Sequence, residues 1–180
     1  MVYVFLANGF EELEALAPID VLRRAGVETV TVGIGSNNIT AAHGVKFVTD
    51  ITDDQIKLGD GLEMIVLPGG MPGALNLENS PDVQAAIDYC SDNGRYIAAI
   101  CAAPQILGHK GLLRGKYCTC FPGFEKELDG AKHTGEPVVC DGNIITAKGA
   151  GAAMRFALKL VAVLCSEGKA AALAASLQFK

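Results

Sequence analysis

The chain has 180 residues, half of them hydrophobic and 19% charged, which is the composition of a compact domain and not of a disordered chain. The net charge of −5 leaves no basic excess for binding a phosphate backbone, so nucleic acid is not an expected partner. The first residues lack the basic segment of a secretory signal, and no apolar run has membrane-spanning length. One domain over residues 1–180, without a membrane partner, is predicted.

The cysteines indicate the compartment. Six of them are spread through apolar segments of a chain too large to depend on disulfides, so we expect free thiols and a cytoplasmic location. Cys90, Cys140 and Cys165 are expected to be small buried core residues. Cys118 and Cys120 form a Cys-x-Cys pair, but no second pair of ligands follows, so no metal is predicted.

Short apolar runs alternate with segments of helical periodicity. In chain order we predict a strand at 2–6, a helix at 11–25, a strand at 28–33, a hairpin within 39–49, a strand at 62–67, a helix at 81–90, a strand at 96–100, a helix at 104–113, a strand at 116–120, a short helix at 124–128, a hairpin within 138–146, and helices at 150–165 and 167–177. Pro18 is expected to kink or restart the first helix because it has no N–H. The order predicts a doubly wound α/β fold, a mostly parallel sheet sandwiched by helices.

Cys101 follows directly after the strand predicted at 96–100 and precedes a helix that starts with Pro104. A side chain at such a turn projects from the carboxyl edge of the sheet, where ligands bind in this fold class. The free N–H groups and the dipole of the next helix stabilise a thiolate. We therefore predict that Cys101 is an unusually acidic thiol and the centre of the site.

Two further loops end at the same edge of the sheet. A carboxyl group from residues 11–14, if buried beside the thiol, would have a raised pKa, could hydrogen-bond to the thiolate and could move protons. Gly69 and Gly70 can turn their N–H groups inward, and with the N–H of Ala102 they would form an oxyanion pocket. The glycine stretches at 33–35 and 148–151 fit no nucleotide-binding pattern, so no cofactor is predicted.

Four motifs resemble, in order and spacing, those of the ThiJ/PfpI superfamily, in particular the branch of the Parkinson's-disease-linked protein deglycase. They are Glu-Glu-Leu-Glu at 11–14, Leu-Pro-Gly-Gly at 67–70, Ala-Ile-Cys-Ala-Ala-Pro at 99–104 and Asp-Gly-Asn-Ile-Ile-Thr at 141–146. The resemblance covers about residues 2–165 and implies a flavodoxin-like homodimer. In it, Cys101 is an oxidation-sensitive nucleophile, Glu14 its protonated partner, and Gly70 and Ala102 the backbone donors.

The resemblance implies cysteine-dependent handling of reactive α-oxoaldehydes, as a glutathione-independent glyoxalase or a deglycase in carbonyl or oxidative stress. The partners would be small aldehydes or glycated protein and thiol adducts. The alternative is a redox-sensing, chaperone-like protein whose cysteine is oxidised to sulfinate without significant turnover. Bacterial-type relatives often carry a thiazole monophosphate biosynthesis label, for which this sequence offers no independent support.

The sequence departs from its relatives at two positions. Some members have a histidine near the cysteine, just before a proline; Phe121 stands there and cannot transfer a proton, so a slow enzyme is expected. The protease-like branch has a histidine directly after the cysteine, where this chain has Ala102, which disfavours peptidase chemistry. Cys120 and His43 are kept as possible pocket residues, although a surface turn is the more ordinary setting for His43.

Overall fold

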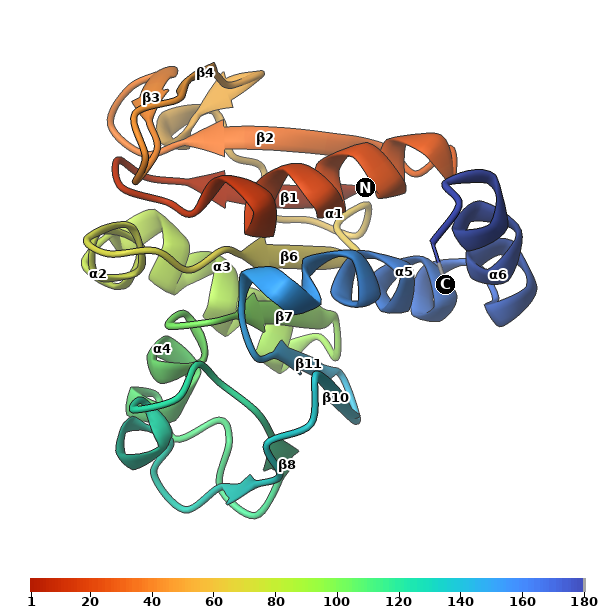
Figure 1. The fold of residues 1–180 in the computed structure, drawn as a ribbon. Coiled ribbons are helices and arrows are strands. Elements are labelled where there is room, and N and C mark those ends of the chain that lie inside the picture. The colour runs from red at the N-terminus through yellow and green to blue at the C-terminus, as the bar shows by residue number, and fades with distance from the viewer. Residues whose placement is uncertain (180) are drawn as a thin grey trace.

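The buried apolar runs form a seven-stranded sheet in the computed structural model, which describes residues 1–179 (Figure 1). The strand order is β10-β11-β7-β6-β1-β2-β5. All neighbouring pairs are parallel except β10 and β11. The bounds are Val2–Leu6 for β1, Thr29–Gly33 for β2, Ile51–Thr52 for β5, Met64–Leu67 for β6, Tyr96–Ile100 for β7, Val138–Asp141 for β10 and Ile144–Ala147 for β11. The predicted flavodoxin-like α/β fold is confirmed.

Helices cover both faces of this sheet. They are α1 (Glu12–Arg24), α2 (Gly73–Glu78), α3 (Pro81–Asp92), α4 (Pro104–His109), α5 (Ala153–Leu164) and α6 (Glu167–Ser176). Figure 1 shows α1 and α5 on one face and α3 on the other. Because both faces are covered, alternate residues of β1 enter different cores: Val4 packs with α1 and α5, and Phe5 packs with the side chains of α3 and α4.

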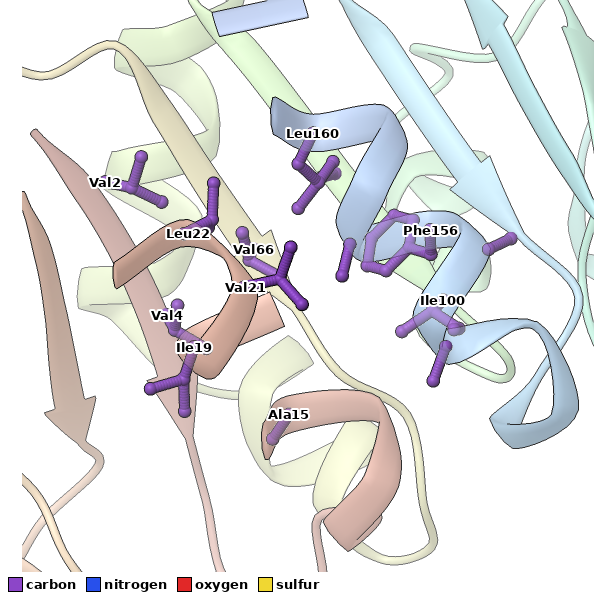
Figure 2. Packing of buried hydrophobic residues seen from close by; sticks show 14 of the residues in the cluster. Val2, Val4, Ala15, Ile19, Val21, Leu22, Val66, Ile100, Phe156 and Leu160 are labelled. Carbon is purple, nitrogen blue, oxygen red and sulfur yellow. The ribbon is translucent and has the colours of Figure 1, made fainter. Parts of the chain in front are cut away.

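The contact between α1 and α5 is the central helix packing of one face (Figure 2). Ile19 and Leu22 of α1 pack in one cluster with Phe156 and Leu160 of α5, over the strands. The prediction that Pro18 restarts the first helix is wrong, because α1 is continuous from Glu12 to Arg24. Burial of apolar side chains on both sides of the proline holds the helical path despite the missing N–H.

Several smaller elements differ from the prediction. The helix expected at 104–113 ends at His109, and α2 was not predicted because its glycine- and proline-rich approach indicated a loop. The strand expected at 116–120 is β8 (Tyr117–Cys118), which pairs with β9 (Lys132–His133) in a separate two-stranded sheet. Short polar strands such as these carry too weak a pattern to predict their partners.

The remaining elements agree with the prediction or are very short. The hairpin within 39–49 is β3 (Asn38–Thr40) with β4 (Lys46–Val48), and β10 with β11 forms the second hairpin. Three single turns of 3₁₀ helix lie at Asp53–Gln55, Glu125–Glu127 and Ala150–Ala152. Within the described residues, none of the helices combines the length and the apolarity needed to cross a bilayer.

All six cysteines are unpaired thiols. Cys90 is buried as expected, but the prediction of burial is wrong for Cys140 and Cys165, whose residues are exposed. Cys140 lies on β10 at the edge of the sheet, and Cys165 ends α5, so neither is covered by a neighbouring layer.

Candidate active site

The strand order reverses at β1. The chain runs from β1 to β2 on one side of it, and later crosses back to place β6 on the other side. Such a switch point opens a crevice at the carboxyl ends of the strands. The loop before α1 leaves β1 there, the Gly69-Gly70 loop leaves β6, and Cys101 leaves the next strand, β7. The topology therefore brings together the three loops that the sequence analysis selected.

Cys101 occupies a constrained turn. Its φ of 65° is a left-handed value that non-glycine residues adopt only at a cost of about 1–2 kcal/mol. Two backbone hydrogen bonds hold it: the Cys101 N–H donates to the carbonyl of Ala147 at 2.9 Å, and the N–H of Phe121 donates to the Cys101 carbonyl at 2.8 Å. The turn directs a half-buried thiol out of the sheet edge, as predicted.

Glu14 lies in the first turn of α1 with no exposed surface. Its Oε2 accepts a hydrogen bond from the N–H of Gly69 at 2.9 Å, and the carboxyl group lies beside the Cys101 side chain. Its own N–H donates at 2.8 Å to Oε2 of Glu11, which caps the helix. Two of the helix-start acids therefore have distinct tasks, because Glu11 caps α1 whereas Glu14 faces the thiol.

Burial controls the proton on this pair. Desolvation raises the pKa of Glu14 to about 7, although the hydrogen bond with Cys101 opposes the shift. Desolvation also raises the pKa of Cys101 to about 12, and the neighbouring Glu14 charge adds to it. The two groups interact strongly, so their protons leave in steps that belong to the pair. Both shifts favour retention of a proton on the pair.

The prediction that Cys101 is an unusually acidic thiol is therefore wrong, because its pKa is raised and not lowered. The N–H groups of Gly70 and Ala102 do favour the thiolate, but burial and Glu14 outweigh them. The helix dipole is also weaker than expected, because α4 has only 6 residues and begins at Pro104. A thiolate forms at this site when the shared proton moves onto Glu14.

The two glycines of the loop after β6, Gly69 and Gly70, have different roles and are not both oxyanion donors. The N–H of Gly69 is used on Glu14, so it positions the carboxyl group and is not free for an oxyanion. A β-carbon on Gly69 would lie 2.7 Å from both Cys101 Cβ and Glu14 Oε2. Gly70 has a φ of 86° and faces the sulfur with its N–H, as does Ala102. Of the three predicted donors, Gly70 and Ala102 are the pair directed at the reacting atom.

An open cleft adjoins the other side of the thiol. It has a volume of about 600 Å³ and includes Phe121, Gly149 and Phe179 in its walls. A β-carbon on Gly149 would lie 3.1 Å from the Phe121 ring and 3.9 Å from Cys101 Sγ, so this glycine marks where the cleft meets the sulfur. Sequence reasoning missed Gly149. The signal was available, because the glycine stretch at 148–151 follows β11 at the same carboxyl edge.

The two possible pocket residues lie elsewhere. Cys120 is buried in the core on the α3 and α4 side, and its neighbour Phe121 lines the cleft instead. His43 lies in the hairpin turn with 73% of its side chain exposed, and its backbone N–H and Nδ1 each lie 2.8 Å from Glu12 oxygens. Although burial acts the other way, these hydrogen bonds hold the pKa of Glu12 below its usual value.

Among residues 1–179, one set of side chains has the spacing of a metal site: Glu11, Glu12 and His43. Hydrogen bonds account for this cluster, since Glu11 caps α1 and Glu12 binds His43. Cys101 and Glu14 lie outside it. The arrangement at the sheet edge is therefore a nucleophile with a buried acid and two amides, a constellation suited to attack on a carbonyl carbon.

The fold and this turn define the class of an α/β protein with a cysteine at a strand-to-helix turn. The chain belongs to the DJ-1/PfpI family, whose sequence model matches residues 1–163. Protein DJ-1 homolog B of Arabidopsis thaliana is 37% identical over 177 residues, which cover 94% of this chain and 39% of that protein. The chain thus spans about two fifths of the length of this relative.

Two further relatives match most of their own length. Protein dj-1beta of Drosophila melanogaster is 36% identical over 92% of this chain and 90% of that protein. The crystal structure of Drosophila melanogaster DJ-1beta superposes with a TM-score of 0.94 at 34% identity, covering 99% of this chain and 97% of that one. The Glutathione-independent glyoxalase DJR-1.2 of Caenorhabditis elegans is 31% identical over 86% of this chain and 82% of that protein.

Proposed function

We propose that this protein is a cysteine-dependent enzyme for reactive α-oxoaldehydes, of the glutathione-independent glyoxalase or deglycase type. The observation that carries the proposal is the position of the Glu14 carboxyl group, which is fully buried beside the Cys101 side chain and has a pKa raised to about 7 by desolvation. Such a pair supplies a nucleophile and an acid–base group without a metal or a second thiol. The name of the Caenorhabditis elegans relative describes the same type of activity.

The reaction begins when the proton of Cys101 moves to Glu14 and the sulfur adds to the aldehyde carbon of methylglyoxal. The hemithioacetal oxyanion accepts hydrogen bonds from the N–H groups of Gly70 and Ala102, which face the sulfur. Glu14, the buried carboxyl group beside the thiol, completes the set of groups at the reacting carbon.

Glu14 next moves the proton of the former aldehyde carbon to the neighbouring carbon through an enediol. The first carbon is thereby oxidised to a thioester and the second is reduced to an alcohol, so no outside oxidant is needed. Water hydrolyses the thioester, which releases lactate and restores the thiol. Because Phe121 cannot take part in proton transfer, Glu14 carries every proton step and the enzyme is slow.

Incubation with methylglyoxal, with lactate as the measured product, tests the proposal. Wild-type protein should form lactate above the buffer rate, and Cys101→Ser should abolish the difference. Cys140→Ser is the matched control, because it removes an exposed thiol that lies outside the site. No rate above buffer, or an undiminished rate in Cys101→Ser, rejects the proposal.

A second candidate function is redox sensing, in which Cys101 is oxidised to the sulfinate. Glu14 Oε1 is buried and lacks a hydrogen-bond partner within residues 1–179, so a sulfinate oxygen could accept a hydrogen bond from it when protonated. Peroxide treatment followed by intact-mass measurement separates the functions. Gain of two oxygen atoms at Cys101, in a protein that turns over no aldehyde, favours the sensor.

We further propose that the protein is cytoplasmic and forms a homodimer. Six unpaired thiols suit a reducing compartment. Leu13 and Leu16 of α1 are 59% and 37% exposed, which leaves an apolar helix face for a second copy. Light scattering should give the mass of two chains, and Leu13→Lys should lower it; the mass of one chain for the wild type contradicts the dimer.

A further inference from the structure

The open cleft beside Cys101 is lined by charged side chains that have no role in the proposed chemistry of Cys101 and Glu14. Two of its lining side chains are charged, Lys148 and Arg155, and both are positive. The chain as a whole has 20 acidic and 15 basic residues. A cleft lined by cations alone is therefore unlike the overall charge of the molecule.

Neither cation has a carboxylate at ion-pair distance among residues 1–179. The charge of Lys148 is nevertheless near enough to Glu125 to add to the backbone hydrogen bonds that lower the pKa of that carboxyl group. Lys148 Nζ donates a hydrogen bond to the carbonyl oxygen of Gly135, at 3.4 Å. Both residues are exposed, so their charges are available to a ligand in the cleft.

The backbone of the cleft adds to the positive field. Ala150, Gly151 and Ala152 line it, and they lead into the start of α5, whose N-cap residue Ala152 makes no side-chain cap hydrogen bond. The N–H groups of Ala152 and Ala153 donate to the carbonyls of Gly149 and Ala150, so only the dipole of this 12-residue helix favours an anion. The positive end of the helix dipole adds to the charges of Lys148 and Arg155, and its contribution is smaller than theirs.

The remaining walls are apolar and adjoin the thiol. Phe121, Pro122, Pro137 and Phe179 line the cleft, and Gly149 joins it to Cys101 Sγ. A carbon chain can thus lie against the rings while its electrophilic carbon reaches the sulfur. An anionic group at the far end of that chain meets Lys148 and Arg155.

We propose that the preferred substrates are α-oxoaldehydes that carry a carboxylate or phosphate a few bonds from the carbonyl, and that Lys148 and Arg155 determine this specificity. This inference rests on the proposed function, because it uses the same attack by Cys101. With 4,5-dioxopentanoate the aldehyde carbon would be oxidised to a carboxylate and the adjacent ketone carbon reduced to an alcohol, with uptake of one water. The product is 2-hydroxyglutarate.

The experiment compares 4,5-dioxopentanoate with its methyl ester, which has the same carbon skeleton with one added methyl group and no charge. For the wild type we expect kcat/KM to be about tenfold higher for the acid, mainly through KM, because two exposed cations contribute about 1.4 kcal/mol. Arg155→Gln and Lys148→Gln should each lower the ratio of acid to ester. Lys169→Gln is the matched control, since it removes an exposed charge that does not line the cleft.

Hydroxypyruvaldehyde phosphate forms the second arm and shows whether a phosphate is preferred to a carboxylate. The inference is overturned if the wild type uses neither anionic substrate better than the uncharged ester. It is also overturned if neither cleft variant changes the ratio of kcat/KM for acid and ester. Methylglyoxal turnover in the same protein would then leave the proposed function intact.

If no aldehyde is turned over, the proposed function fails and the inference is decided by binding. Glutarate would be titrated into the protein while the amide resonances of residues 149–151 are followed by nuclear magnetic resonance. Saturable shifts that weaken in Arg155→Gln support an anion site in the cleft. Absence of shifts in the wild type overturns it.

Discussion

The two sides of Cys101 are built in opposite ways. On the side of Glu14 and Gly69 the atoms are closely packed, and a single added carbon on Gly69 would lie within 2.7 Å of two of them. On the other side Gly149, where an added β-carbon would lie 3.9 Å from Cys101 Sγ, lines a cleft of about 600 Å³. In the proposed reaction the packed side would hold the shared proton and the open side would admit the substrate. The difference indicates that proton transfer and substrate choice depend on separate sets of residues.

Glu14→Gln should have the largest effect on the packed side. The amide keeps the shape of the side chain and can accept from the Gly69 N–H, but it cannot take up or release the shared proton. We expect kcat for methylglyoxal to fall by about 10²–10⁴-fold. Lactate formation by the purified variant measures this. A rate within twofold of the wild type would show that Glu14 moves no proton in the reaction.

Gly69→Ala should disturb both the thiol and the carboxyl group, because its β-carbon has no free space between them. Overpacking of this kind costs about 1–3 kcal/mol, and we expect the rate to fall by roughly 100-fold. Gly151→Ala tests the open side, where an added β-carbon meets nothing within 4 Å. Denaturant unfolding and lactate formation should separate the two variants; equal behaviour would contradict the contrast between the sides.

The raised pKa of Glu14 also predicts how stability changes with pH. Its pKa is about 7 in the folded protein against an ordinary 4.5, so the folded state holds the proton more tightly than the unfolded state. The stabilisation is complete below pH 4.5 and is lost as the pH rises to about 7, by about 3 kcal/mol.

Unfolding by urea at a series of pH values measures this loss. In Glu14→Gln the free energy of unfolding should lack this part of the decline between pH 4.5 and 7. A wild-type curve parallel to that of the variant would argue that the carboxyl group is not buried in solution. The raised pKa of Cys101 does not interfere, because it affects stability only above pH 9.

Phe121→His should have the smallest effect. The Phe121 ring lies next to Gly149 and lines the cleft. The cleft leaves room for a histidine side chain at this position. A protonated imidazole near the sulfur favours the thiolate, so we expect a rise in rate of less than about tenfold, with an added dependence on pH near neutrality. Phe121→Leu is the control without a titrating group. The same rate in both variants would exclude a role for charge at this position.

Much of this architecture follows from the sequence alone. Buried runs such as 2–6 and 96–100, separated by helical segments, determine a mostly parallel sheet, because only a strand covered on both faces is apolar throughout. The loops that follow β1, β6 and β7 must then meet at one edge, which is why Cys101, Glu14 and Gly70 could be selected before the structure. The family motifs added the pairing of Cys101 with Glu14.

Only the tertiary structure decided how these groups act. Whether the thiol is acidic depends on burial and on a charge from a distant segment, and neither can be obtained from local sequence, so the predicted acidity of Cys101 was wrong. The continuity of α1 through Pro18 likewise depends on packing against α5. The cleft combines residues from 121 to 179, which the fold alone brings to one side of the sulfur, and its positive charge arises from Lys148 and Arg155, which meet there.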